Sequence, residues 1–194
     1  MIKKFNDFAQ TKAITDNTQL PKGAYIMTIK SAEVNENSVG QYVKMSLDVA
    51  EGEYAGHFLN DYNSQTSEDK KWHRNYFLNV PKDDGSEKDN WTKRKFKTFT
   101  DALMESNPGY AFDWDEQKFI GKKVGALFNE QEYRKNDGTV GSSTAIARVI
   151  TIEAVRTGNY KMPADKKLKE ANGPVSTDTS FINVPDGAEE EIPF

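Results

Sequence analysis

The fold class of this chain follows from Gln41-Tyr42-Val43-Lys44-Met45-Ser46-Leu47-Asp48-Val49-Ala50-Glu51. Apolar side chains recur at every second position from Val43 to Val49, and polar or amphipathic side chains occupy the positions between them. That period of two is typical of a β-strand with one buried face and one face in water. We therefore predict a strand over Gln41 to Glu51, in a protein that is mainly β.

Strands are also predicted on both sides of this stretch. Ala24 to Val34 alternates in the same way, after Pro21 and Gly23 mark the start of the folded body. The polar run from Asn35 to Gly40 has the length of a hairpin connection. A third strand is predicted over His57 to Tyr62, beyond the turn that Gly52 and Gly56 bracket. Three strands in sequence predict a meander.

The period then changes to that of helices. Thr66 to Asp69 resembles a helix start that leads into Lys70 to Leu78. A second helix is predicted over Trp91 to Ser106, with Asn90 as its N-cap and Pro108-Gly109 at its end. At about 100° per residue, three apolar side chains of this helix share one face, which we expect to be buried: Phe96, Phe99 and Leu103.

Two more strands complete the body. Lys122 to Tyr133 and Ser143 to Val155 alternate, and Asn136-Asp137-Gly138 between them is a strong hairpin turn signal. Three strands, a helical insertion and two strands match a five-stranded OB-type barrel, a fold that binds oligonucleotides and oligosaccharides. The predicted fold is therefore an OB-type barrel over residues 1–161, with its helical insertion between strands three and four.

Composition narrows the class of protein. The chain has 194 residues and no cysteine, which excludes a disulfide framework and a thiolate metal site. It has no apolar run of about 18 residues and no apolar segment near Met1, so we expect no membrane span, no secretory signal and an intracellular protein. Residues 162–194 hold three lysines against seven acidic residues, whereas residues 1–161 hold 23 basic and 23 acidic residues. We expect residues 162–194 to form a flexible acidic tail, because Ala164 to Gly187 is too polar to fold alone.

Signs of catalysis are sparse. The sequence has two histidines, His57 and His73, and lacks the phosphate-loop and His-Glu-x-x-His motifs. Asp113-Trp114-Asp115-Glu116 is a cluster that could hold Mg²⁺ in a nuclease, but we favour an acidic loop before Phe119, because metal sites need ligands from several elements. We therefore predict no catalytic residue, no metal and no cofactor, and keep a Mg²⁺-dependent nuclease as an alternative.

Basic and aromatic residues interleave in three stretches. Single-stranded nucleic acid is held by cations that follow the phosphates and by rings on which bases stack. The third stretch lies at the tip of the predicted hairpin, a position that OB-folds use for ligand contact. The candidate DNA-binding residues are Lys70, Lys71, Trp72, Arg74, Tyr76, Trp91, Lys93, Arg94, Lys97, Tyr133, Arg134 and Lys135.

Each stretch also has a structural interpretation. Trp72, Tyr76 and Phe77 would pack a helix onto the barrel, and Tyr133 would cap the hairpin. The cations of the second helix would be a solvated face, without an intervening acid to pair with them. The residues alone leave these alternatives open.

The chain ends in Glu189-Glu190-Glu191-Ile192-Pro193-Phe194. An anionic end with an aromatic anchor suits capture by a partner that offers an apolar pocket and basic groups or backbone amides. A solvated tail is the alternative, but a purely solubilising tail has no reason to end in Ile-Pro-Phe. The tip is therefore predicted to bind a partner protein.

This tip resembles that of bacterial and phage single-stranded DNA-binding proteins, although Glu189, Glu190 and Glu191 stand where that family more often has Asp. A weaker resemblance to a family of phage proteins runs from Leu20 to about Gly158, carried by Leu20-Pro21-Lys22-Gly23-Ala24-Tyr25 and Glu51-Gly52-Glu53-Tyr54-Ala55-Gly56. These resemblances imply a bacteriophage protein that binds single-stranded DNA regardless of sequence, in the cytoplasm of a bacterial host. They imply roles in DNA replication and DNA recombination, with partner enzymes that dock at the tip. A homo-oligomer is compatible with these roles. An adaptor that does not bind DNA remains the other alternative.

Overall fold

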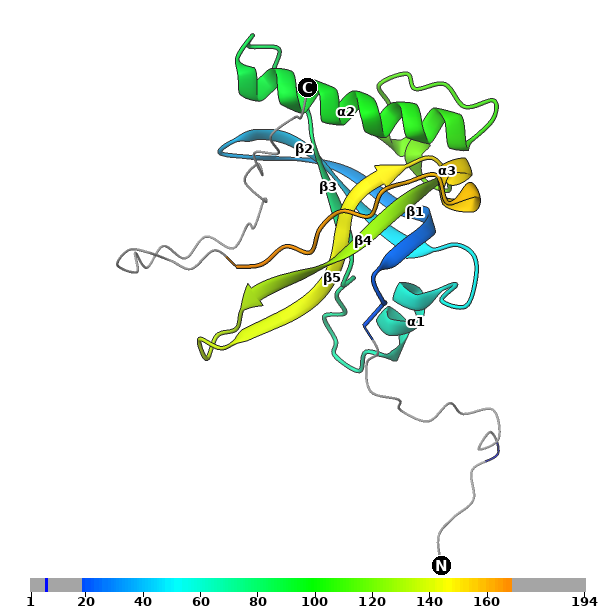
Figure 1. Cartoon of the computed structure of the whole chain (residues 1–194), viewed down its shortest axis with the longest axis vertical. Helices are drawn as coiled ribbons and strands as arrows, with labels where there is room; N and C mark the ends of the chain where they lie inside the picture. The colour runs from blue at the N-terminus through cyan, green and yellow to red at the C-terminus, as the bar shows by residue number, and fades with distance from the viewer. Residues whose placement is uncertain (1–5, 7–18, 169–194) are drawn as a thin grey trace, which may run out of the picture.

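The computed structural model of the chain describes Asn6 and residues 19–168 (Figure 1). These residues form an antiparallel sheet with helices between and after its strands. None of the described helices combines the length and apolar character needed to cross a membrane. In chain order the elements are β1 (Gly23–Asn37), β2 (Gly40–Val49), α1 (His57–Ser64), β3 (Asn75–Asn79), α2 (Glu87–Ser106), the 3₁₀ turn η1 (Glu116–Phe119), β4 (Lys123–Arg134), β5 (Val140–Ile150) and α3 (Ile152–Thr157).

The five strands lie in the order β3-β2-β1-β4-β5, and every neighbouring pair is antiparallel. The prediction of a mainly β fold with five strands, and with a helix between the third and fourth, is confirmed. The sheet is strongly curved, but β3 and β5 are not hydrogen-bonded to each other, so the sheet is open along these two edges (Figure 1). Closure into a barrel is therefore not confirmed.

The prediction of a strand over His57 to Tyr62 is wrong, because this segment forms α1. Gly56 precedes the helix in a left-handed conformation, with φ of 74°, and turns the chain into α1. The buried carboxylate of Asp48 then accepts a hydrogen bond from the backbone N–H of Phe58 at 3.0 Å. Asp48 therefore satisfies one of the free N–H groups of the first helical turn. That cap comes from ten residues upstream, where a local sequence pattern gives no sign of it.

The prediction of a helix over Thr66 to Leu78 is also wrong. Residues 65–74 form an irregular loop, and β3 begins at Asn75. In β3 the side chains of Tyr76 and Leu78 face the core, while Phe77 faces solvent. Tyr76 lies opposite Met45 and Leu78 opposite Val43 on β2. Pairing with a strand already present thus overrides the local helical pattern.

Helix α2 begins four residues before the predicted start at Trp91, so Asn90 is not its N-cap. Ser86 takes that position, and its hydroxyl accepts a hydrogen bond from the N–H of Asp89 at 3.1 Å. The predicted buried face is confirmed, because Phe96, Phe99 and Leu103 all lie in the core.

The last predicted strand also differs in its bounds. It starts earlier than predicted, at Val140, and stops at Ile150. Thr151 then caps α3, its hydroxyl accepting from the N–H of Ala154 at 3.1 Å. The prediction that this strand continues to Val155 is therefore wrong.

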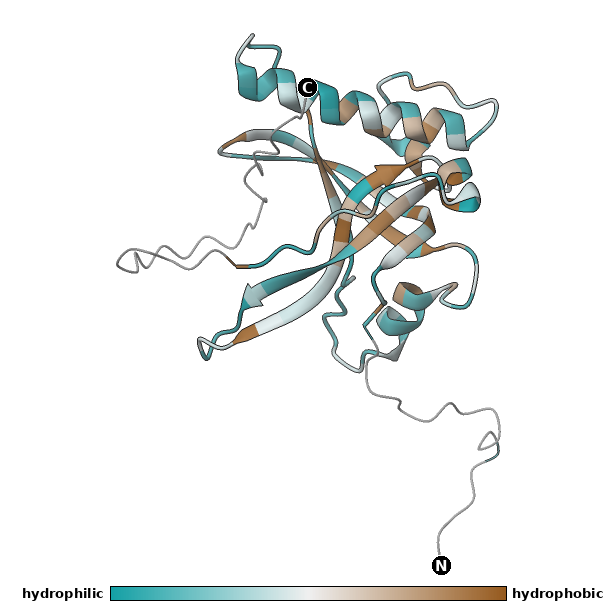
Figure 2. Ribbon diagram, in the orientation of Figure 1, coloured by the Kyte–Doolittle hydropathy of each residue, from teal (hydrophilic) through white to brown (hydrophobic). Residues whose placement is uncertain are grey.

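Two layers cover the sheet unequally. The inner face carries the main core, across which α2 lies. Figure 2 shows that hydrophobic residues are frequent along the central strands. On the outer face, α3 packs closely on β4 at Gly125, where an added Cβ would come within 2.7 Å of both Val155 Cγ2 and the carbonyl oxygen of Thr151.

Candidate nucleic-acid interface

The aromatic residues of the first predicted stretch are engaged within the protein. Trp72 is packed against the core, and its indole Nε1 donates to the carbonyl oxygen of Leu47 at 3.1 Å. The ring of Tyr76 stacks on Phe99, with centroids 5.8 Å apart and planes 19° apart. Burial raises the pKa of Tyr76 to about 12. The structural interpretation of Trp72 and Tyr76 as packing residues therefore holds, although β3 and its preceding loop carry them rather than a helix.

Arg74 is also largely withdrawn from solvent. Its guanidinium lies 5.9 Å from the centroid of the Phe58 ring, and burial lowers its pKa. Lys70 and Lys71 are exposed. Lys71 lies 3.9 Å from the carboxylate of Asp69, and Lys70 lies 5.8 Å from the centroid of the Tyr62 ring, so this stretch offers little free positive charge.

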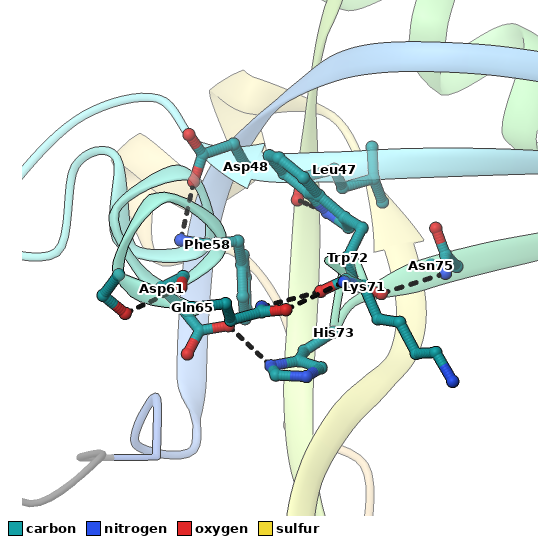
Figure 3. A network of polar contacts seen from close by, with 10 residues as sticks. Leu47, Asp48, Phe58, Asp61, Gln65, Lys71, Trp72, His73 and Asn75 are labelled. Carbon is teal, nitrogen blue, oxygen red and sulfur yellow. Dashed lines mark hydrogen bonds and ion pairs between the residues drawn. The ribbon is translucent and has the colours of Figure 1, made fainter. Parts of the chain in front are cut away.

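A network of polar contacts fixes the loop that carries these residues (Figure 3). His73 Nδ1 lies 2.6 Å from the carboxylate of Asp61 on α1. The side-chain amide of Gln65 donates to the carbonyl oxygen of Lys71 and accepts from its N–H, both at 2.8 Å. The loop is therefore tied to α1 through His73 and to β2 through Trp72, and Gln65 braces it from within.

The second predicted stretch lies on α2, where two of the cations have carboxylate partners. Lys93 pairs with Asp83 and Asp89, and Asp83 is the main cause of its raised pKa. Lys97 pairs with Asp101, one turn further along the helix. The interpretation of an acid-free cationic face is therefore wrong for these two lysines.

The rest of this stretch remains open to solvent. Trp91 is 48 % exposed, and the cationic groups of Arg94 and Lys95 lie 5.7 and 5.2 Å from the centroid of its ring. Neither cation makes an ion pair within residues 19–168. Trp91, Arg94 and Lys95 are referred to below as the α2 cationic patch.

The third predicted stretch lies where it was expected, at the tip of the β4–β5 hairpin that projects beyond the body (Figure 1). The N–H of Lys135 donates to the carbonyl oxygen of Thr139 at 2.8 Å and closes the predicted turn. Tyr133 is 43 % exposed and lies over Gly141, where an added Cβ would come within 2.9 Å of its ring. Arg134 and Lys135 are exposed beside it. The hairpin tip therefore offers one ring and two cations.

The structure adds an aromatic surface that the sequence reasoning missed. Phe77, on the outer face of β3, is 50 % exposed, and its ring centroid lies 5.9 Å from that of Tyr42 on β2. Lys44 is directly opposite Phe77 in the register of the two strands. We call Tyr42, Lys44 and Phe77 the β2–β3 platform. The alternation over Gln41 to Glu51 already predicts that Tyr42 and Lys44 face solvent. The sequence analysis misses Phe77 because it predicts a helix where β3 lies.

No cluster of three or more His, Asp or Glu side chains is arranged to hold a metal ion in the part of the chain that the structure describes. In the acidic loop, Asp113 pairs with Lys118. The carboxylate of Asp115 accepts a hydrogen bond from the N–H of Gln117 at 3.0 Å, at the start of η1. These two carboxylates thus hold the loop together.

The chain beyond α3 runs beside the part of β4 that extends past its pairing with β1, and it is parallel to that strand. The N–H of Lys166 donates to the carbonyl oxygen of Glu130 at 2.8 Å, and the N–H of Glu132 donates to that of Lys166 at 2.9 Å. Asp165 pairs with Lys22 at 2.9 Å and accepts from the N–H of Glu130 at 3.0 Å. Residues 164–168, which open the predicted tail, are thus hydrogen-bonded to the sheet and lead toward the hairpin tip. The predicted partner-binding tip, Glu189 to Phe194, lies outside the described residues.

This edge contact is expected to weaken in acid. The hydrogen bond from Lys22, followed by that from Glu130, holds the pKa of Asp165 below its ordinary value of 3.8. A folded pKa below the unfolded one means that the stabilisation is fully present above the ordinary pKa and is lost as the pH falls through the folded pKa. Hydrogen exchange should therefore show lower protection of the Lys166 amide below about pH 4 than at pH 7.

The variant Asp165→Asn should reproduce that loss of protection at pH 7. Asp137→Asn is the matched control, because Asp137 also has a lowered pKa but bonds Thr139 at the hairpin tip. Equal protection of the Lys166 amide in Asp165→Asn and the wild type would contradict the role of Asp165 in holding this segment against β4.

The sequence matches no protein-family model and no curated protein.

Proposed function

We propose that this protein binds single-stranded DNA without sequence preference, with its curved sheet acting as a partly open OB-type barrel. The observation that carries the proposal is the β2–β3 platform. OB-folds bind oligonucleotides on the face of strands two and three and with the loops that join strands one to two and four to five. The exposed ring of Phe77 lies on the corresponding face, and the basic hairpin tip is the corresponding second loop.

The platform has the chemistry of single-strand recognition. A base stacks on any aromatic face whatever its hydrogen-bonding edge, so recognition by stacking tolerates every sequence. Phe77 and Tyr42 supply adjacent rings, and Lys44 supplies a cation for the phosphate beside them. Tyr133, Arg134 and Lys135 repeat the same combination at the hairpin tip.

Binding should depend moderately on salt. The body carries equal numbers of basic and acidic residues, so the affinity cannot come from a strongly positive overall field. Each neutralised phosphate of a single strand contributes about −0.7 to the slope of log K against log salt concentration. With Lys44, Arg134 and Lys135 as contacts, we expect a slope of roughly −2.

Fluorescence anisotropy of labelled oligo(dT), titrated at several salt concentrations, tests this proposal. The expected result is saturable binding of oligo(dT), with similar affinities for oligo(dA) and oligo(dC). No binding at low salt would contradict the proposal and favour an adaptor that acts through its tip alone. Cleavage of the oligonucleotide that requires Mg²⁺ would favour the nuclease instead.

The C-terminal tip is proposed to recruit replication and recombination proteins of an infected bacterial cell. The acidic tail that carries this tip is covalently attached to the DNA-binding body and is therefore present there at high effective concentration. It would compete with weakly bound DNA for the cationic groups of the body. Deleting Glu189 to Phe194 should therefore tighten oligo(dT) binding at low salt and abolish partner recruitment. The measurements are the anisotropy titration and a pull-down from phage-infected cells, and a deletion that changes neither would overturn both roles.

A further inference from the structure

Trp114 is 78 % exposed, more than any other large hydrophobic side chain in the described residues. Its φ of 69° lies in the left-handed region, which is unfavourable for a bulky residue. The backbone strain costs free energy, and an indole that stays largely in water offsets little of that cost by burial. Such an outlier on a surface points to a contact with another molecule.

The surrounding residues hold the indole firmly in this position. One face of its ring stacks on Phe96, with centroids 6.1 Å apart and planes 12° apart, and Phe112 lies 5.1 Å away. The Asp113–Lys118 ion pair and the Asp115 cap fix the loop on both sides of it. The other face of the ring is therefore presented to solvent by a supported loop.

The chemistry around Trp114 selects a cation. Asp113, Asp115 and Glu116 flank the indole. Lys118, the single cation among these neighbours in sequence, pairs with Asp113 and lies 3.7 Å from Asp115, so three acidic groups against one cation leave the segment with a net charge of −2. The electron-rich face of Trp attracts ammonium and guanidinium groups, and the carboxylates add to that attraction. Phosphates would be repelled here. The surface fits the cationic side chains of a protein and not a nucleic acid.

The chain itself carries a matching surface in the α2 cationic patch. Arg94 and Lys95 lie over Trp91 without ion-pair partners in residues 19–168, so they are available to acidic groups of another molecule. Trp91 precedes Phe96 by five residues, which places it about 140° around α2 from the side on which Trp114 stacks. One molecule thus presents two surfaces of opposite charge on different sides of the same helix.

We propose that the partner is a second copy of this chain, whose Arg94 and Lys95 contact Trp114 and its flanking carboxylates. The two contacting surfaces are different, so the interface is heterologous and each added copy leaves a free surface of each kind. Copies would therefore join head to tail. The contact needs no nucleic acid and stands independently of the proposed function, but on a single strand it would favour neighbouring over isolated binding.

Mixing two variants of the full chain tests this contact. Arg94→Glu/Lys95→Glu removes one surface and keeps Trp114, whereas Trp114→Ala removes the other and keeps both cations. All three side chains are exposed, so the urea midpoint of the double variant should equal that of the wild type, and Trp114→Ala, which loses its stacking on Phe96, should remain fully folded with a somewhat lower midpoint. Sedimentation velocity at low salt, without DNA and at up to about 1 mM protein, measures self-association.

The wild type should associate with increasing concentration, and each variant alone should associate about tenfold or more weakly. An equimolar mixture of the two variants should recover a 1:1 complex, because one complete interface can form between them. A wild type that stays monomeric throughout would overturn the proposal. So would variants that associate like the wild type, a mixture that gains nothing, or loss of association in the Arg94→Glu/Lys95→Glu variant alone.

Discussion

Replacing Phe77 by alanine is expected to weaken oligo(dT) binding roughly 5- to 150-fold, because one base loses its stacking surface and each such contact is worth about 1–3 kcal/mol. Phe77 is half exposed on an edge strand, so its removal should leave the free energy of unfolding nearly unchanged. Anisotropy titration and urea denaturation of the same preparation measure both quantities.

Neighbouring substitutions serve as controls for Phe77→Ala. Phe77→Trp should retain binding, because the larger ring still offers a stacking face. Tyr76→Ala, one residue earlier but facing Phe99, should instead lower stability by roughly 3–5 kcal/mol, as truncation of a buried aromatic residue does. Wild-type affinity in Phe77→Ala would mean that the single strand does not lie on the β2–β3 platform.

Phe99→Ala should lower the free energy of unfolding by about 3–5 kcal/mol, as much as Tyr76→Ala. The Phe99 ring is 1 % exposed and lies between Tyr76 of β3 and Phe119 of η1, with centroids 5.8 and 5.7 Å away. Its removal leaves a cavity where α2, the sheet and η1 meet. The loss is a large share of the 5–15 kcal/mol that stabilises a typical domain.

Urea denaturation monitored by circular dichroism measures that loss. Trp91→Ala is the matched control on the same helix, since Trp91 is half exposed and its removal should change stability by no more than about 0.5 kcal/mol. Similar midpoints for the two variants would contradict the described packing of α2 on the sheet.

The sequence predicts the fold well wherever the pattern of apolar residues within one segment determines the structure of that segment. β2 lies within one or two residues of its predicted bounds, and the Asn136-Asp137-Gly138 turn closes the predicted hairpin. The predicted buried face of α2 is also correct, because three apolar residues at helical spacing specify it.

The errors concern segments whose structure depends on distant residues. α1 needs the buried carboxylate of Asp48 as a cap, and β3 needs Val43 and Met45 as pairing partners. The sequence analysis predicts a strand where α1 lies and a helix where β3 lies. It therefore does not place Phe77 beside Tyr42. Ion pairs between Lys93 and the Asp83 loop, and between Lys97 and Asp101, changed the expected charge of α2.

Photo-cross-linking of oligo(dT) that carries 5-iododeoxyuridine tests most directly whether single strands lie on the outer face of β2 and β3. Peptide mapping should place the cross-links at Phe77 and Tyr42, with Tyr133 as a further position on longer oligonucleotides. Cross-links confined to Trp91 or Trp114 would contradict the account. So would the absence of cross-links at Phe77, Tyr42 and Tyr133 under conditions where the oligonucleotide is bound.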